Sequence, residues 1–318
     1  MVPAAYAQFK GKLSEKVNYS IGVRSEFTDA IGVSNITDST LLDTTYFNIF
    51  PNALLNWRIN EKWNLSVNYS GRIDRPRFQS LDPFVWYQDS LTSRSGNPFL
   101  KPEITHAFET SVGYKMYSLK AGYNYSMNHF RYAVLPGGFA ENSVVFKPIN
   151  IENLHSVYAS LTIPVQVKFW NSFNTASFTL NKIVDSRPEL VSGVVRPQLY
   201  LYSYNSFDVK DWFRLELMGE YVGSQNDGVY SNKDTYWVAA GISKQFFNKK
   251  LMCQFLVNDI FVSYRDAGSY TIGQTAVEYE WRMSSNFYRL TLRYNFGKLK
   301  DIIYNTKNTG EDEIERTN

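Results

Sequence analysis

An alternation of apolar and polar residues constrains the fold of this chain more than any other feature. Residues 62–73 show it clearly, because every second position there is apolar except Gly71: Trp63, Leu65, Val67, Tyr69 and Ile73. A period of two over this length is typical of a β-strand with one apolar and one polar face. Strands of about ten residues are long enough to cross a bilayer at a tilt.

The same alternation recurs along the chain and predicts about 13 strands. The expected spans are 3–10, 16–27, 45–58, 62–74, 103–116, 118–131, 144–163, 169–181, 196–208, 212–224, 233–245, 250–263 and 284–297. The pattern is weakest in 103–116, 144–163 and 169–181, where we expect a bulge or a loop extension.

The predicted connections alternate in length. The short ones are 11–15, 58–61, 116–117, 164–168, 209–211 and 246–249, and the long ones are 28–44, 75–102, 132–143, 182–195, 225–232 and 264–283. Short periplasmic turns alternating with longer extracellular loops are the rule for outer-membrane barrels. The sequence therefore predicts an all-β, antiparallel transmembrane β-barrel over residues 1–297, in the bacterial outer membrane. Residues 298–318 are mostly charged or polar and predict a disordered periplasmic tail.

Composition agrees with a barrel and excludes several other classes. The chain is 16% aromatic, with 23 Tyr and 22 Phe, as expected for the aromatic girdles at both membrane interfaces. No run of 18 apolar residues exists, which excludes a transmembrane helix. The net charge of +3 comes without a basic run, so we expect no nucleic-acid partner.

Catalytic and metal-binding patterns are not found in the sequence. Cys253 is the only cysteine, which rules out a disulfide framework. His106, His129 and His155 lie far apart and lack carboxylates at ligand spacing, so we expect no metal and no cofactor. Nothing places a nucleophile beside a base, and we expect the protein not to be an enzyme.

The predicted number of strands also indicates whether the chain forms a whole barrel or part of a larger one. The last strand follows a long loop and should run towards the periplasm, and counting back gives the first strand an extracellular start. Complete bacterial barrels have an even strand number. We therefore expect the chain to be the C-terminal part of a larger barrel. If the count is wrong by one, the alternative is a self-contained 12- or 14-stranded porin or structural barrel. A soluble binding protein would leave its repeated apolar face exposed, which soluble monomers do not tolerate.

Several short motifs carry a family resemblance. They are Arg72-Ile-Asp-Arg-Pro76, Phe78-Gln-Ser-Leu-Asp-Pro-Phe84, Gly96-Asn-Pro-Phe-Leu-Lys-Pro-Glu103, Phe50-Pro-Asn-Ala53 and Tyr294-Asn-Phe-Gly297. Together they resemble the TonB-dependent-receptor-like outer-membrane β-barrel proteins of the Bacteroidetes. The resemblance runs from about residue 5 to the end and is most specific between Arg72 and Glu103.

The resemblance implies a 22-stranded barrel with an N-terminal plug, which imports large or scarce solutes such as metal chelates, glycans or peptides. It implies as partners the outer-membrane lipid, the missing N-terminal barrel and plug, TonB through that absent part, and a surface lipoprotein. This chain departs from the pattern, because it contains neither a plug nor a TonB-contacting segment. It leaves the transported solute open.

The loop 75–102 is the best candidate site. It combines aromatic and arginine side chains, as recognition surfaces do. The candidate ligand-binding residues are Arg75, Arg77, Trp86, Tyr87, Asp89 and Arg94. A structural role is favoured for the motif residues Arg72, Pro76, Gly96, Asn97, Pro98, Phe99, Leu100, Lys101 and Pro102, because proline and glycine fix turns.

Charged residues on the polar face of the strands have two interpretations. These residues are Arg24, Glu26, Glu109, Arg214, Glu216, Glu220, Arg289 and Arg293. They could line a solute path, but we favour ion pairs inside the barrel and contacts with a plug.

Overall fold

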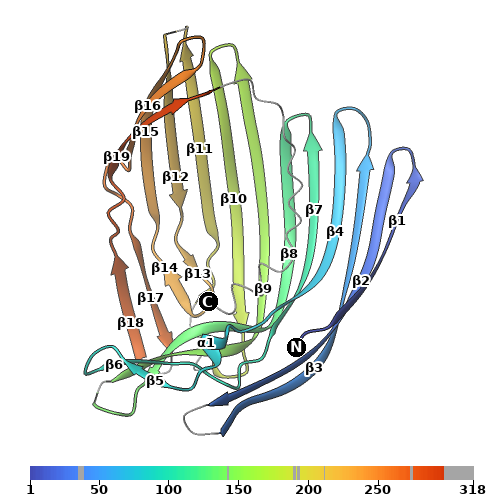
Figure 1. Cartoon of the computed structure of the whole chain (residues 1–318), viewed down its shortest axis with the longest axis vertical. Coiled ribbons are helices and arrows are strands. Elements are labelled where there is room, and N and C mark those ends of the chain that lie inside the picture. The colour runs from blue at the N-terminus through green and yellow to red at the C-terminus, as the bar shows by residue number, and fades with distance from the viewer. Residues whose placement is uncertain are drawn as a thin grey trace.

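A single curved, antiparallel sheet forms the wall of the molecule (Figure 1). The computed structural model describes residues 1–34, 39–141, 143–188, 191, 194–210, 212–272 and 275–296. The wall strands are β1 Ala4–Ser14, β2 Val17–Ser34, β3 Ser39–Arg58, β4 Trp63–Asp74, β7 Glu103–Tyr114, β8 Tyr117–Pro136, β9 Val144–Val167, β10 Trp170–Val184, β11 Gln198–Val209, β12 Phe213–Val222, β15 Thr235–Phe246, β16 Leu251–Asn258 and β19 Phe287–Tyr294. Each pairs with the next in this order, and β1 and β19 are the two edges of the sheet in the described part of the chain.

The predicted all-β fold and the predicted wall strands are confirmed. Each of the 13 expected spans overlaps one wall strand, and the six short turns join β1–β2, β3–β4, β7–β8, β9–β10, β11–β12 and β15–β16. These turns lie at one end of the sheet, and the long connections lie at the other (Figure 1). No helix in the described residues is long and apolar enough to span a membrane.

The strand ends differ from the prediction, mainly at the end with the long connections. The expected loop 28–44 is largely strand, since β2 runs to Ser34 and β3 begins at Ser39. Strand β8 likewise continues to Pro136, whereas β16 already ends at Asn258. The bulges expected in 103–116, 144–163 and 169–181 are not found, because β7, β9 and β10 pair with their wall neighbours without a register shift. The predicted tail, 298–318, lies outside the described residues.

The register places apolar side chains in rows on the outer face of the wall. One such row joins Tyr69, Phe108, Tyr123, Val157 and Leu180 across β4, β7, β8, β9 and β10. Directly opposite residues of an antiparallel pair share one face. The row is therefore a band that faces the hydrocarbon of the membrane.

The inner face carries the polar side chains, which bond to one another. Glu109 accepts from the Tyr158 hydroxyl at 2.6 Å and pairs with Lys120 at 3.1 Å. Glu216 accepts from Tyr204 at 3.0 Å and from Gln254 at 2.5 Å.

The ion pairs expected inside the barrel are found for Arg24 with Glu26 and for Arg214 with Asp208. Glu220 instead accepts hydrogen bonds from Tyr200 and Trp237. Arg289 lies over the Phe287 ring. Contact of any of these residues with a plug stays a prediction.

The opposite end of the molecule holds a second body of structure, which we call the cap. It consists of residues 75–102, the outer part of the β8–β9 hairpin (128–141 and 143–152), and the segments 183–188, 225–232, 266–272 and 275–281. Its own elements are α1 Phe78–Leu81, β5 Val85–Tyr87, β6 Thr92–Ser95, β13 Gln225–Asn226, β14 Tyr230–Asn232, β17 Asp266–Ile272 and β18 Thr275–Trp281.

The cap contains the hydrophobic core of the described residues, made by Ala133, Val134, Ile151, Ile183, Val229 and Tyr270. The β8–β9 hairpin crosses towards β17 and β18 to reach it (Figure 1). Asn128, where the hairpin leaves the regular ladder, has a positive φ of 54°.

Candidate functional site

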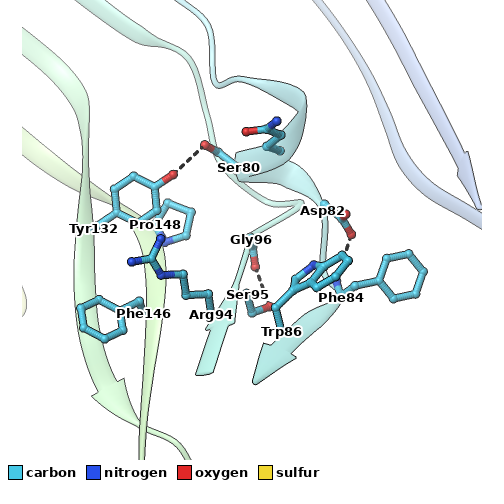
Figure 2. Close-up of a pocket in the computed structure, with 11 residues that line it drawn as sticks. Ser80, Asp82, Phe84, Trp86, Arg94, Ser95, Gly96, Tyr132, Phe146 and Pro148 are labelled. Atoms are coloured by element: carbon cyan, nitrogen blue, oxygen red, sulfur yellow. Dashed lines mark hydrogen bonds between the residues drawn. The ribbon is translucent and has the colours of Figure 1, made fainter. Parts of the chain in front are cut away.

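The loop 75–102 and the β8–β9 hairpin together enclose a cavity of about 630 Å³ in the cap (Figure 2). Its lining combines aromatic, hydroxyl and charged side chains, a mixture usual in ligand sites of this size. The lining residues are Gln79, Ser80, Asp82, Phe84, Trp86, Arg94, Ser95, Gly96, Tyr132, Phe146 and Pro148.

Arg75 anchors the start of this loop to the wall. Its guanidinium pairs with Glu26, donates to Thr28 Oγ1 at 2.9 Å and donates to the Tyr46 hydroxyl at 3.2 Å. Burial alone would lower the pKa of Arg75, but its hydrogen bond to Glu26 and the neighbouring groups raise it above its ordinary value. Arg75 therefore holds the loop on β2 and β3, away from the cavity.

The Gly96 segment closes the loop on itself. The amide of Gly96 donates to Asp82 O at 2.8 Å, and that of Asn97 donates to Ser80 O at 2.7 Å. A Cβ atom on Gly96 would lie 2.4 Å from Asp82 O, so only glycine allows this close approach.

The rest of the motif ties the loop to β9. Asn97 donates through its side chain to Pro148 O at 3.1 Å, and the Lys101 amide donates to the Asn150 side chain at 2.8 Å. Pro76 and Leu100 are buried, whereas Phe99 is 85% exposed.

The structure separates the six candidate ligand-binding residues. Trp86 and Arg94 line the cavity. Tyr87 packs edge-on against Phe139, with ring centroids 5.1 Å apart. The Asp89 carboxylate accepts from the Leu91 amide at 2.8 Å, and this hydrogen bond lowers the pKa of Asp89. Arg77 is exposed at the start of α1. Ligand contact by any of them stays a prediction.

Arg94 is the cationic group of the cavity. Its guanidinium carbon lies 5.7 Å from the centre of the Phe146 ring and points towards Tyr132 and Phe146 (Figure 2). No carboxylate among the described residues forms an ion pair with it. The Ser80 and Tyr132 hydroxyls lie 3.2 Å apart on the same side, and Trp86 is 70% exposed at the rim. The arrangement suits binding of a ligand with an anionic group and a flat ring.

Sequence reasoning missed the cavity residues outside the predicted loop. Tyr132 and Phe146 belong to strands β8 and β9, which continue beyond the membrane part of the wall. The available signal was the apolar stretch 132–135, which is too long for a simple surface loop.

An ion pair fixes the far end of the β8–β9 hairpin. Arg131 donates to Asp227 Oδ2 at 2.8 Å and lies 5.0 Å above the Tyr230 ring. The Tyr230 hydroxyl donates to Tyr132 O, and burial raises the pKa of Tyr230 to about 12. The hairpin that supplies Tyr132 and Phe146 to the cavity is thus held from the opposite side of the cap.

The described residues contain no group of three or more His, Cys, Asp or Glu side chains that could hold a metal ion. The groups around the cavity can bind and orient a ligand. None of the cavity side chains pairs a nucleophile with a base.

Comparisons with known proteins agree with this architecture. A family model described as "Outer membrane protein beta-barrel family" matches residues 1–294. No curated protein matches the chain.

Solved structures of receptors are similar in fold. The ferric enterobactin receptor PfeA of Pseudomonas aeruginosa, in the R480A mutant bound to enterobactin, gives a TM-score of 0.61 at 15% identity over 92% of this chain and 45% of that one. The siderophore receptor PirA of Acinetobacter baumannii gives 0.61 at 12% identity over 93% of this chain and 46% of that one. The copper transporter OprC gives 0.58 at 10% identity over 87% and 46%. The chain thus spans less than half the length of these proteins.

Proposed function

Because the chain belongs to the outer membrane protein beta-barrel family, we propose that it is the solute-binding wall of an uptake receptor. The protein lies in the bacterial outer membrane. We propose that it imports a large or scarce solute, such as a metal chelate, a glycan or a peptide, which first binds in the cap. The observation that carries this proposal is the cavity of about 630 Å³, with Trp86 and Arg94 turned towards it.

The edges of the wall support a larger assembly. In a bilayer, unpaired backbone N–H and C=O groups cost several kcal/mol each, so an open sheet edge is not stable there. Strands β1 and β19 do not pair with each other in the described part of the chain. We propose that further N-terminal strands close the barrel, about nine of them if the complete barrel has 22. A plug and TonB would then act as partners of the complete protein, and a surface lipoprotein is a further proposed partner.

The alternative, a self-contained barrel of 12 or 14 strands, needs a wall count that differs by one and a pairing of β1 with β19. The described residues show 13 wall strands and no such pairing. Ion conductance by the purified chain in planar bilayers would favour this alternative.

Uptake measurements test the proposal. Cells with and without the full-length gene are given, separately, a labelled ferric catecholate chelate, a copper salt, an oligosaccharide and a peptide. We expect uptake of one of these solutes to depend on the gene. If none does, and conductance is found instead, the proposal of an uptake receptor is wrong.

Variants of the cavity sharpen this test. Trp86→Ala and Arg94→Gln should each reduce binding of the imported solute about 10-fold or more, as expected for anchor residues. Phe99→Ala is the matched control, because Phe99 is 85% exposed and lies outside the cavity. Equal loss in all three variants would show that the cavity is not the binding site.

A further inference from the structure

A row of basic and aromatic side chains crosses the outer face of the wall near the cap. The register joins His106 of β7, Tyr125 of β8, His155 of β9 and Lys182 of β10 directly, one beside the next. The row next to it, towards the short turns, is the apolar row that contains Phe108, Tyr123 and Val157. The basic row therefore lies where the hydrocarbon band of the membrane gives way to the outer headgroups.

Hydrogen bonds hold the two imidazoles of this row in place. The Tyr69 hydroxyl bonds to His106 Nδ1 at 2.8 Å, and the Tyr123 hydroxyl bonds to His155 Nδ1 at 2.7 Å. The Tyr125 ring packs beside that of His155, with centroids 5.1 Å apart. In both pairs the tyrosine belongs to a neighbouring strand, so the ring positions are fixed by the sheet itself.

The remaining donors of the row are free. Neither His106 nor His155 has a partner at Nε2 among the described residues. In the tautomer in which the tyrosine hydroxyl donates to Nδ1, the imidazole carries its proton on Nε2 and can donate it. Lys182 is exposed and forms no ion pair within the described part of the chain. Neighbouring strands lie 4.7–4.9 Å apart, which places the two imidazoles about 10 Å apart and Lys182 about 5 Å further along.

The described surface around this row lacks acidic side chains. Along β4 and β7 to β10, all of which the structure describes, the positions in register with this face carry no Asp or Glu. The acidic residues of these strands are on the opposite parity, and Glu109, for example, bonds to Tyr158 and Lys120 inside the barrel. Nothing on this face competes with an external anion for the three donors.

We propose that this row, His106, Tyr125, His155 and Lys182, binds the phosphate groups of anionic lipids in the outer leaflet, one at His155 and Lys182 and another at His106. A phosphate accepts hydrogen bonds from imidazole N–H and ammonium groups, and basic side chains at the membrane surface attract anionic headgroups. The aromatic rings position the site at headgroup depth, as aromatic belts do. The acyl chains of such lipids would then lie along the apolar row. This inference does not depend on which solute the cavity binds.

Competition between lipids at the protein surface tests the proposal. The full-length protein is placed in nanodiscs, and spin-labelled phosphatidylglycerol and phosphatidylcholine are compared for the fraction immobilised at the protein. We expect a preference for phosphatidylglycerol. Lys182→Gln should weaken that preference about five-fold, the effect of one basic side chain at an anionic surface. The triple variant His106→Asn, His155→Asn, Lys182→Gln should abolish it.

Lys10→Gln is the matched control. It makes the same charge change on β1, where Lys10 pairs with Ser20 on the inner face of the wall. We expect it to keep the preference unchanged. An unaltered preference in the Lys182 variant, or equal retention of both lipids by the unmodified protein, would overturn the proposal. If the triple variant does not fold, Lys182→Gln alone decides, because Lys182 is exposed and its loss breaks no internal contact.

Discussion

Along strand β9, Ile151 is 2% exposed and Ile163 is 36% exposed, although the same strand carries both. Ile151 packs into the core of the cap, whereas Ile163 is on the outer face of the wall. The wall has a membrane as its apolar environment and places its polar bonds inside. The cap is surrounded by water and needs a core of its own. The two halves of β9 therefore bury their apolar side chains differently, one half in a protein core and the other against lipid.

The largest expected difference between the two regions is in cavity formation. Ile151→Ala should destabilise the cap by about 2–5 kcal/mol, because the lost side chain leaves a void in a packed core. Ile163→Ala should cost much less, since lipid chains can fill the space. Hydrogen exchange of β8 and β9 measures both effects. Equal protection factors in the two variants would show that the cap has no core of the kind described.

A charged side chain should destabilise the protein more on the outer face of the wall than on the inner face. Val67→Arg places a cation on the outer face in the middle of β4 and should cost about 2–4 kcal/mol. Asn68→Arg should cost far less, because Asn68 faces the lumen directly opposite Glu109. The measurement is the free energy of unfolding in lipid vesicles by urea titration. A similar cost at both positions would mean that the faces are assigned wrongly.

Acid should loosen the part of the cap around Asp185. Burial would raise the pKa of Asp185, but hydrogen bonds from Arg187 and from the Glu152 amide hold it at about 2, below its ordinary value of 3.8. A lowered pKa gives stability that is complete above the ordinary value and is lost as pH falls towards 2. With Arg187 partly exposed, we expect a loss of about 1–2 kcal/mol.

Hydrogen exchange of residues 150–188, corrected for the intrinsic rates, follows this loss between about pH 5 and pH 2. Asp185→Asn is the control, and its protection should no longer change over this range. If the unmodified protein shows no change either, the carboxylate does not support the cap.

The wall strands could be predicted because the residues that define each strand lie within that strand. An alternation such as that of Trp63, Leu65 and Val67 reports on its own strand, and a short turn then specifies the neighbour. All 13 wall strands were found in this way. The alternation weakened in 144–163 for a physical reason, since the outer half of β9 packs against the cap core and has no membrane on either side.

The cap was not predictable, because distant residues build it. Arg131 meets Asp227, and Tyr132 meets Tyr230, across almost a hundred residues of chain. The loop 75–102 was identified from composition, and two of its six candidates, Trp86 and Arg94, do line the cavity. Three of the eleven lining residues, Tyr132, Phe146 and Pro148, come from β8 and β9, and the apolar stretch 132–135 alone does not show that these strands bend over the loop.

The pairing of each wall strand with its chain neighbours has a consequence for how such proteins evolve. A hairpin can be duplicated or lost as a unit, which changes the circumference by two strands and leaves every other pair intact. A single inserted residue is far more harmful, because it moves every following side chain of that strand to the opposite face of the sheet. Length variation among descendants of this gene should therefore come in whole hairpins within the wall, and in single residues only where the chain leaves it.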